Sequence, residues 1–368
     1  MRISFCVPRC TPDNSHGRYV VELAKRMARE HLVTVYAGAF WAPLRSAVEC
    51  RLLPVPNRPA VARLAALWSA STVTSTLRRA DIVHIQGADA PVGNVVTAHC
   101  CNAAMRDAAN GGASAIRKLN YAIGIAAEQY CLTKPSTRGV IAVSRRVKTD
   151  IETAYRVDPA RIAVIPLGVD ANAFHPRARE LVRDPTRERL GLRRDDFVVV
   201  FVGRDYRLKG LATLLEAAHR SRQAVQVIAV GVKLDPPLKA LVLEKELRGR
   251  VRFVSDAPDP APYYAAADCF VLPTYYDTFS LATLEAMASG LPVIVSRTAG
   301  ISEHLTDGHD AVVLADPRDA EALARHLDRL VDDDGLRSAL GEQARKTAER
   351  FSWERVAERT LALYRQAL

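Results

Sequence analysis

Short apolar runs alternate with helical patterns along almost the whole chain. In the first half these runs are rich in Val and Ile, and they are Ile3–Val7, Leu32–Tyr36, Ile82–Ile85, Val95–Ala98, Val140–Val143 and Ile162–Pro166. Helical patterns fill the gaps, as at His16–Arg29 and at Ser144–Tyr155, where Ser144 is placed to cap the helix. Strands that are apolar on both faces are typical of parallel sheets covered by helices. The pattern predicts an α/β fold with a doubly wound parallel sheet.

A second series of the same kind begins after Asp196. Its expected strands are Phe197–Val202, Val225–Val230, Val251–Val254, Cys269–Leu272, Pro292–Val295 and Ala311–Leu314, and its expected helices are Leu211–Arg220, Pro237–Leu247, Asp319–Asp332 and Gly335–Arg350. The arginine-rich stretch from residue 176 to about residue 196 is the best candidate for a domain boundary. We therefore expect two Rossmann-like doubly wound domains, residues 1–175 and 176–350, that face a cleft. A C-terminal helix, residues 351–368, is expected to cross back to the N-terminal domain.

Composition limits the class of protein. The chain has 368 residues, of which 49% are hydrophobic and 25% are charged, as in soluble globular proteins of two ordinary domains. No apolar run approaches the ~20 residues of a membrane helix, and the start of the chain is too weakly apolar for a signal peptide. Seven cysteines without paired spacing indicate reduced thiols. These features predict a cytoplasmic protein.

The positive charge is confined to the first half of the chain. Residues 1–175 carry 22 Lys and Arg against 12 Asp and Glu, whereas the remainder carries 29 of each. Such a field favours an anionic partner, which could be an anionic glycan or lipid-linked acceptor or an acidic membrane surface, and we expect no nucleic acid. A GC-rich genome, whose codons favour arginine, explains the excess equally well.

Two basic stretches with apolar faces suggest peripheral contact with an anionic membrane, at the inner face of the cytoplasmic membrane. The first is Arg58–Arg79, which includes Arg63, Leu64, Leu67, Trp68, Val73, Leu77 and Arg78. The second is Ala115–Tyr130, with Arg117 and Lys118 near its start. For each stretch taken alone, an internal helix is the alternative interpretation.

The segment of residues 273–296 carries the clearest chemical motif. It has the pattern of a loop, a helix and a strand, with Asp277 on the loop and Glu285 inside the helix, about two turns on and on roughly the same face. Backbone N–H groups at a helix start attract anions, while carboxylates accept hydrogen bonds from hydroxyls. Phosphate beside a polyol is what a nucleotide sugar presents, so the segment predicts a nucleotide-sugar site.

A basic loop follows the first strand of the second series. Gly203 allows a tight exit from that strand, and Arg204 and Lys209 can converge on one pyrophosphate. Because a departing nucleoside diphosphate gains negative charge, two fixed cations stabilise the transition state more than the ground state. A solvated basic loop is the alternative. No Asp-x-Asp triplet is placed to hold a metal against a diphosphate, so we expect no metal and no cofactor.

Three motifs in order carry a family resemblance. They are Ile165-Pro-Leu-Gly-Val-Asp170 with Phe174 and Pro176, Arg204-x4-Lys209-Gly210, and Asp277-x7-Glu285 followed by Ala-Met-Ala-x-Gly-x-Pro-Val. Together they resemble the retaining glycosyltransferases of family 4, which have the GT-B fold of two Rossmann-like domains. Within that family the chain is similar to bacterial sugar transferases of lipopolysaccharide core and other surface polysaccharides.

The resemblance implies a role for each matching residue. Arg204 and Lys209 would grip the donor diphosphate, Asp277 would contact the sugar near its 3 and 4 hydroxyls, and Glu285 would hold the ribose. His99 would face the sugar from the N-terminal domain, and the resemblance makes it catalytic together with Arg204, Lys209 and Asp277. The residues implied in donor binding are Gly17, Gly203, Phe279, Ser280, Leu281 and Glu285.

Departures from the family pattern leave the donor open. Asp277 stands where glutamate is usual, Ser280 replaces a common glycine, and His16-Gly17 replaces a glycine pair. The resemblance implies transfer from a nucleoside-diphosphate sugar to a hydroxyl of a glycan or lipid-linked acceptor. The alternatives are a GT-B epimerase or phosphorylase and a non-catalytic sugar-nucleotide-binding protein. A dehydrogenase is disfavoured, since no Gly-x-Gly-x-x-Gly follows a strand.

Overall fold

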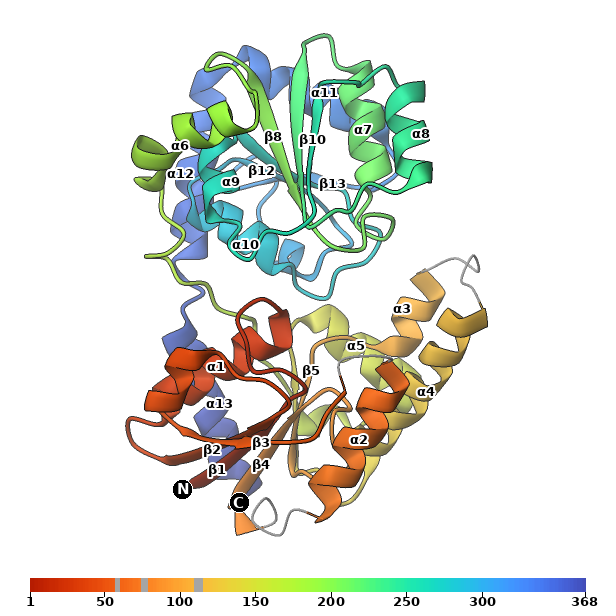
Figure 1. Ribbon diagram of the computed structural model, residues 1–368, viewed down its shortest axis with the longest axis vertical. Coiled ribbons are helices and arrows are strands. Elements are labelled where there is room, and N and C mark those ends of the chain that lie inside the picture. Colours follow the sequence, from red (N-terminus) through yellow and green to blue (C-terminus); the bar gives the residue numbers. More distant parts are fainter. Residues whose placement is uncertain (57–59, 74–78, 109–114) are drawn as a thin grey trace. The chain divides into compact units, whose positions relative to one another are not determined.

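The computed structural model describes residues 1–56, 60–73, 79–108 and 115–368, and it divides the chain into two compact units. Unit 1 is Met1–Gly168 together with Trp353–Leu368, and unit 2 is Val169–Ser352. Each unit is a parallel sheet with helices on both faces (Figure 1), which confirms the predicted fold class. The chain passes between the units at residues 168–169, seven residues before the predicted boundary, and returns at residues 352–353.

Unit 1 has seven strands within the described residues, in the order β3-β2-β1-β4-β5-β6-β7. They are β1 (Arg2–Cys6), β2 (Leu32–Ala37), β3 (Glu49–Leu52), β4 (Ile82–Gln86), β5 (Val95–Ala98), β6 (Gly139–Ala142) and β7 (Ile162–Val164). The helices are α1 (Ser15–Met27), η1 (Ala42–Ser46), α2 (Ala60–Val73), α3 (Asn102–Ala108), α4 (Ala115–Thr133), α5 (Arg145–Tyr155), η3 (Pro159–Arg161) and α13 (Trp353–Ala367). The sequence did not reveal β3, because this short edge strand is mostly exposed and carries no apolar run.

Local capping sets where the helices of unit 1 begin. Asn14 caps α1 by accepting a hydrogen bond from the amide of Gly17, and Ser144 caps α5 as predicted, accepting from Val147 at 3.1 Å. Figure 1 shows α1 and α13 on one face of the sheet and α2, α4 and α5 on the other. The start of α13 lies against Gly168, where an added Cβ would come within 2.7 Å of the Trp353 nitrogen. Glycine therefore lets the last helix join unit 1.

Unit 2 has six strands, in the order β10-β9-β8-β11-β12-β13, and all of its residues are described. They are β8 (Phe197–Val202), β9 (Val225–Val230), β10 (Val251–Val254), β11 (Cys269–Leu272), β12 (Val293–Ser296) and β13 (Val312–Leu314). The helices are α6 (Ala178–Arg189), α7 (Leu211–Arg220), α8 (Pro236–Glu244), α9 (Ala261–Ala266), α10 (Leu281–Ala288), η4 (Gly300–His304), α11 (Ala320–Asp332) and α12 (Asp334–Ala348). The four strands β8–β11 have the predicted bounds, because each is a short segment rich in β-branched and aromatic residues.

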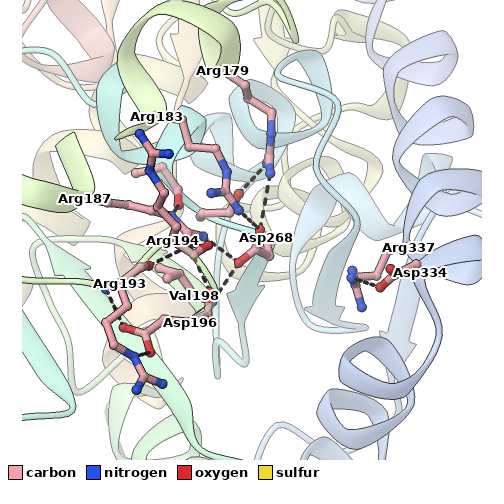
Figure 2. A network of polar contacts seen from close by, with 12 residues as sticks. Arg179, Arg183, Arg187, Arg193, Arg194, Asp196, Val198, Asp268, Asp334 and Arg337 are labelled. Carbon is pink, nitrogen blue, oxygen red and sulfur yellow. Dashed lines mark hydrogen bonds and ion pairs between the residues drawn. The ribbon is translucent and has the colours of Figure 1, made fainter. Parts of the chain in front are cut away.

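Most of the arginine-rich stretch after residue 176 is helix α6, which lies within unit 2 and not at the domain boundary. Three arginines spaced four residues apart on α6 donate to the carboxylate of Asp268, which precedes β11; they are Arg179 (3.2 Å), Arg183 (2.7 Å) and Arg187 (2.7 Å). Figure 2 shows them converging on it. Burial opposes ionisation of Asp268, but the arginines and the amide of Val198 outweigh it and hold its pKa below the usual value. The charges that suggested a domain boundary instead attach α6 to Asp268 at the start of β11.

No helix among the described residues is both long enough and apolar enough to cross a bilayer. The seven cysteines all lie in the described part of the chain, and each is free.

Candidate functional site

Two loops at the carboxyl ends of β8 and β11 touch each other in unit 2. The carbonyl of Leu208, in the first loop, accepts a hydrogen bond from the amide of Tyr275, in the second, at 2.9 Å. Gly210 has a positive φ of 75°, and a Cβ there would lie only 1.9 Å from the carbonyl oxygen of Pro273. Because only glycine fits this approach, Gly210 fixes the distance between the loops.

This contact brings a predicted cation and a predicted carboxylate together. The Nζ of Lys209 lies 2.6 Å from Oδ2 of Asp277, and the two side chains are 21% and 12% exposed. A Cβ on Gly203 would lie 3.1 Å from Cγ of Lys209, so the stem of the lysine packs on this glycine. The other carboxylate oxygen, Oδ1, accepts from the amide of Phe279 at 3.3 Å. The sequence separates these groups by 68 residues, and the fold pairs them.

Ser280 begins α10 in an unusual backbone conformation. Its φ and ψ are 81° and 77°, in the left-handed region that favours glycine, so the glycine common at this place in the family suits the local backbone. Its Oγ accepts a hydrogen bond from the amide of Thr283 at 3.4 Å and lies 2.7 Å from the hydroxyl oxygen of Thr283. Leu281 is the first helical residue. Strain of this kind is typical of segments that approach a ligand.

The two carboxylates of the predicted motif do not share a helical face. Asp277 lies in the loop, where its carbonyl accepts from Gly300 at 2.9 Å, and α10 starts only at Leu281. Glu285 lies within α10, is 5% exposed, and accepts a hydrogen bond from the Tyr264 hydroxyl at 3.0 Å. The same-face expectation was wrong because it extended the helix four residues too far.

Arg204 follows Gly203 at the end of β8. It lies beside Gly231, where an added Cβ would be 3.7 Å from Cγ of the arginine. The loop that carries it is held to the start of α8, since the hydroxyl of Tyr206 donates to Asp235 at 2.7 Å. Arg204 is thereby positioned at the carboxyl ends of β8 and β9, the edge where doubly wound sheets bind ligands.

His99 belongs to unit 1, directly after β5. Its ring nitrogen Nε2 lies 2.8 Å from Oε1 of the buried Gln86, and its ring stacks on that of His16 with centroids 4.2 Å apart. Burial, with the nearby His16 and His84, lowers the pKa of His99 well below its usual value. His99 is therefore a neutral imidazole, suited to hydrogen bonding with hydroxyls rather than to pairing with phosphate.

Gly17 has a structural reason for being glycine. A Cβ there would lie 2.4 Å from the carbonyl of Thr11 and 2.5 Å from that of Arg9, and its amide donates to Asn14 at 2.7 Å. The resemblance implies a role for Gly17 in donor binding, but its amide already donates to Asn14. Gly17 sets how closely α1 packs on the preceding loop.

The predicted residues thus fall into two groups. Unit 2 holds Arg204, Lys209, Asp277, Phe279, Ser280, Leu281 and Glu285 with Gly203, and unit 1 holds His99 and Gly17. Sequence reasoning missed the partners Gln86 and Tyr264, for which no local signal exists, and it left Gly210 without a role. Among the described residues, no three His, Cys, Asp or Glu side chains converge so as to hold a metal ion.

Comparison with known families covers most of the chain. Residues 16–173 match the model described as Glycosyltransferase Family 4, and residues 182–347 match the model described as Glycosyl transferases group 1.

Curated relatives match part of the chain. A D-inositol 3-phosphate glycosyltransferase of Salinispora arenicola is 34% identical over 246 residues, which cover 62% of this chain and 55% of the relative. An MMP alpha-(1->4)-mannosyltransferase of Mycolicibacterium hassiacum is 33% identical over 235 residues, covering 62% and 54%. The chain spans about half the length of these relatives.

Solved structures match the whole chain in fold. WaaG, a glycosyltransferase involved in lipopolysaccharide biosynthesis, aligns with a TM-score of 0.83 at 24% identity and covers 97% of this chain and 98% of its own. HepE of Anabaena, solved with UDP-glucose, aligns with a TM-score of 0.74 at 19% identity and covers 98% and 99%.

Proposed function

The chain belongs to the family 4 glycosyltransferases of GT-B fold, and we propose that it transfers a sugar, with retention, from a nucleoside-diphosphate sugar to a hydroxyl of a glycan or lipid-linked acceptor. The contact between Lys209 and Asp277 carries this proposal. It places a cation for a diphosphate beside a carboxylate for sugar hydroxyls, at the carboxyl edge of a parallel sheet.

The ion pair suggests how the donor is received. A charge-assisted bond between ammonium and carboxylate keeps both groups ordered before the donor arrives. On binding, Lys209 exchanges Asp277 for the diphosphate, and the freed carboxylate accepts hydrogen bonds from the sugar. Since Asp277 is one methylene shorter than the usual glutamate, the sugar sits close to the β11 loop.

The proposed chemistry is a same-face substitution. The bond between the anomeric carbon and the phosphate oxygen breaks, the acceptor oxygen bonds to that carbon on the same face, and the acceptor proton moves to the leaving phosphate oxygen. Arg204 and Lys209 stabilise the negative charge that grows on the diphosphate. These cations supply the charge that a metal would otherwise provide, so transfer should persist in excess EDTA.

The relatives support a search among particular substrates. HepE was solved with UDP-glucose, which makes UDP-sugars the first donors to test. The curated relatives are named for inositol phosphate and mannosyl transfer, whereas WaaG is named for lipopolysaccharide biosynthesis. We therefore propose a role in glycan or lipid-linked glycan synthesis, with lipopolysaccharide or surface polysaccharide as one product class.

We place the enzyme in the cytoplasm, in keeping with its free cysteines, with peripheral contact to an anionic membrane through unit 1. At the start of α4, Ile116 and Leu119 are 74% and 59% exposed and lie beside Arg117 and Lys118. Exposed apolar side chains flanked by cations suit anionic headgroups.

The stretch Arg58–Arg79 supports membrane contact less well. Leu67 is buried, and the indole of Trp68 donates to the carbonyl of Ala88 at 2.8 Å, so these side chains pack within unit 1. Leu77 and Arg78 lie outside the described residues, as do the side chains of Arg63 and Val73.

Sedimentation with anionic liposomes tests the membrane proposal. Replacing Ile116 and Leu119 by serine should release most of the bound protein, because it removes the exposed apolar contact. Leu181→Ser is the matched control, since Leu181 is 79% exposed on the arginine-rich helix α6 of unit 2. Equal binding of all variants would count against the proposal.

A thermal-shift screen of nucleoside diphosphates and their sugars tests the main proposal. A ligand that binds the native state at 100 times its Kd stabilises it by about 2.7 kcal/mol. We expect one base to raise the melting temperature, and Lys209→Ala to remove the shift. A donor that binds but is never transferred to any acceptor would favour the non-catalytic alternative.

A further inference from the structure

Part of the positive excess of unit 1 converges on a pocket at the amino ends of β1, β2 and β3. The pocket has a volume of about 540 Å³, and four arginines line it: Arg2, Arg45, Arg51 and Arg79. Among the described residues that line it, Glu49 is the one carboxylate. The volume lies in the usual range for small-molecule sites, and arginine is the cation best suited to bind oxyanions.

Short polar side chains leave room for this pocket on one face of the sheet. The register of β1 with β2 pairs Ser4 with Thr34, and that of β2 with β3 pairs Thr34 with Glu49. Arg51 lies two residues after Glu49 and therefore on the same face. This end of the sheet thus presents hydroxyl groups and a cation in place of the large apolar side chains that would fill it.

The carboxylate in the walls already has partners. Oε1 of Glu49 lies 2.7 Å from Nη2 of Arg51, and Oε2 accepts a hydrogen bond from the Thr34 hydroxyl at 2.9 Å. These two partners hold the pKa of Glu49 below its usual value, so it is ionised and balances the charge of Arg51. Arg2 is balanced in the same way by Asp81, which does not line the pocket, at 3.2 Å.

Arg45 and Arg79 are the two cations that remain. The guanidinium carbon of Arg45 lies 5.3 Å from the centre of the Phe40 ring, and neither arginine forms an ion pair with a carboxylate of the described residues. Both are exposed, so an anion can reach them without a change in the fold. Two cations without counter-ions at one pocket create a local field that attracts an anion.

The pocket is separate from the candidate functional site. Glu49 begins β3 and Arg79 precedes β4, whereas His99 follows β5. In a parallel sheet these positions lie at opposite edges, which are about 16 Å apart for strands of five residues. A ligand in the pocket would therefore bind whether or not the transferase proposal holds.

We infer that this pocket binds the phosphate group of a phosphate monoester, with Arg45 and Arg79 as its anchoring cations. A monoester carries a charge of about −1.5 to −2 at pH 7, which the two remaining arginines match. A guanidinium donates two parallel hydrogen bonds to phosphate, and such charge-assisted bonds are stronger than neutral ones. A soluble phosphorylated metabolite and the headgroup of a phosphomonoester lipid present this same chemistry. Leu32, which also lines the pocket, is 73% exposed and offers an apolar contact to the rest of either ligand.

Titration of the full chain with sn-glycerol 3-phosphate at low ionic strength tests the inference. Calorimetry measures the affinity, and hydrogen exchange locates the bound phosphate. We expect protection in peptides of residues 29–52 and 79–86, and weaker binding as salt is added, because the cations are exposed. Protection confined to residues 203–210 and 273–281 of unit 2 would overturn the inference, since the phosphate would then bind only at the candidate donor site.

A double substitution tests the two anchoring cations. Arg45→Gln combined with Arg79→Gln should weaken binding at the pocket at least about tenfold, because each removes a charged hydrogen-bond donor. The charge-matched control is Arg106→Gln combined with Arg156→Gln, at two exposed arginines of unit 1 that do not line the pocket. The control should bind like the wild type. Equal weakening in both variants would show that only net charge attracts the phosphate.

Vesicles distinguish the two sources of the phosphate group. A variant with Ile116→Ser and Leu119→Ser, which lacks the other proposed membrane contact, is sedimented with phosphatidylcholine vesicles that contain or lack phosphatidic acid. Sedimentation that requires phosphatidic acid, Arg45 and Arg79 identifies a lipid headgroup. Binding of sn-glycerol 3-phosphate without such sedimentation identifies a soluble ligand. If neither probe binds at low ionic strength, the inference is overturned.

Discussion

The two units share a fold but differ in the chemistry at the carboxyl ends of their strands. In unit 2 a lysine and an aspartate lie 2.6 Å apart, whereas in unit 1 the corresponding edge carries the neutral pair of His99 and Gln86 at 2.8 Å. Unit 1 is nevertheless the more positive unit, with 25 Lys and Arg against 13 Asp and Glu, while unit 2 has 26 against 28. The net charge of a unit therefore does not reveal whether its candidate site residues are charged. The near-neutral unit contains the Lys209–Asp277 ion pair, and the basic unit contains the neutral His99–Gln86 pair.

The same contrast holds for buried side chains elsewhere in the two units. In unit 2 the buried Arg187 depends on Asp268, whereas in unit 1 the buried His84 lies 2.6 Å from Thr97 and 2.6 Å from Tyr364 and is uncharged. Loss of a buried charge should destabilise unit 2, whereas protonation of a buried neutral group should destabilise unit 1.

Loss of the Asp268 charge should have the largest effect. Asp268→Asn leaves Arg187, which is 1% exposed, without its counter-ion, and such a loss destabilises by about 3–5 kcal/mol. Urea unfolding followed by hydrogen exchange should show the loss in peptides of unit 2. Asp195→Asn, at a 77% exposed carboxylate, is the control. Equal stability of the two variants would remove the claim that unit 2 depends on buried ion pairs.

Removal of the site lysine should come next. Lys209→Ala should lower turnover by about a hundredfold or more at saturating donor, by analogy with removal of one preorganised donor. Arg207→Ala is the matched control, because Arg207 lies in the same loop but pairs with Asp235 at 3.2 Å. Near-normal turnover of the lysine variant would reject its role in catalysis.

The pH dependence should distinguish the units. Burial lowers the pKa of His84 to about 3, below the unfolded value of about 6.5, so between these values the unfolded state binds more protons. Stability of unit 1 should be full above pH ~6.5 and fall by up to about 1.4 kcal/mol per pH unit as acid is added.

Unit 2 should lose less stability over the same range, because its His326, whose pKa burial also lowers, is only partly buried. The pKa of Asp268 is lowered in the fold, so its contribution is present above its unfolded value and lost only as the pH falls below about 3.9. Hydrogen exchange at pH 7 and pH 5 measures both units at once. An equal loss of stability in both units would contradict the comparison. So would a His84→Gln variant whose unit 1 stability depends on pH as steeply as that of the wild type.

The smallest effect concerns Ser280. Ser280→Gly should relieve the strain of a positive φ while losing the cap to Thr283, with a net change within about 1 kcal/mol. Ser280→Ala keeps the strain and loses the cap, so it should be less stable than the glycine variant by about 1 kcal/mol. Thermal unfolding of the pair measures this difference, and the reverse order would show that the strain is absent.

The sequence predicted the parts of the fold that depend on local pattern. β8 to β11 and α7 have the predicted bounds, and Ser144 caps α5, because apolar runs and capping residues act on their immediate neighbours. The prediction failed where the same local pattern is compatible with two different structures. The arginines of α6 suggested a domain boundary, and their partner Asp268 lies 81 to 89 residues away in the sequence.

For the candidate site, the sequence provided the residues and the tertiary structure provided the pairings. The motifs that contain Arg204, Lys209, Asp277 and Glu285 predicted them as site residues without coordinates. The ion pair of Lys209 with Asp277 forms because Gly210 permits two loops to approach each other. The hydrogen bond of Glu285 forms because Tyr264 of α9 reaches α10. The residues of a chain determine which chemistry is present. The burial of side chains and the distances between remote ones determine which groups are ionised in the folded protein. Both the cost of desolvation and the strength of an ion pair depend on surroundings that no local stretch of sequence contains.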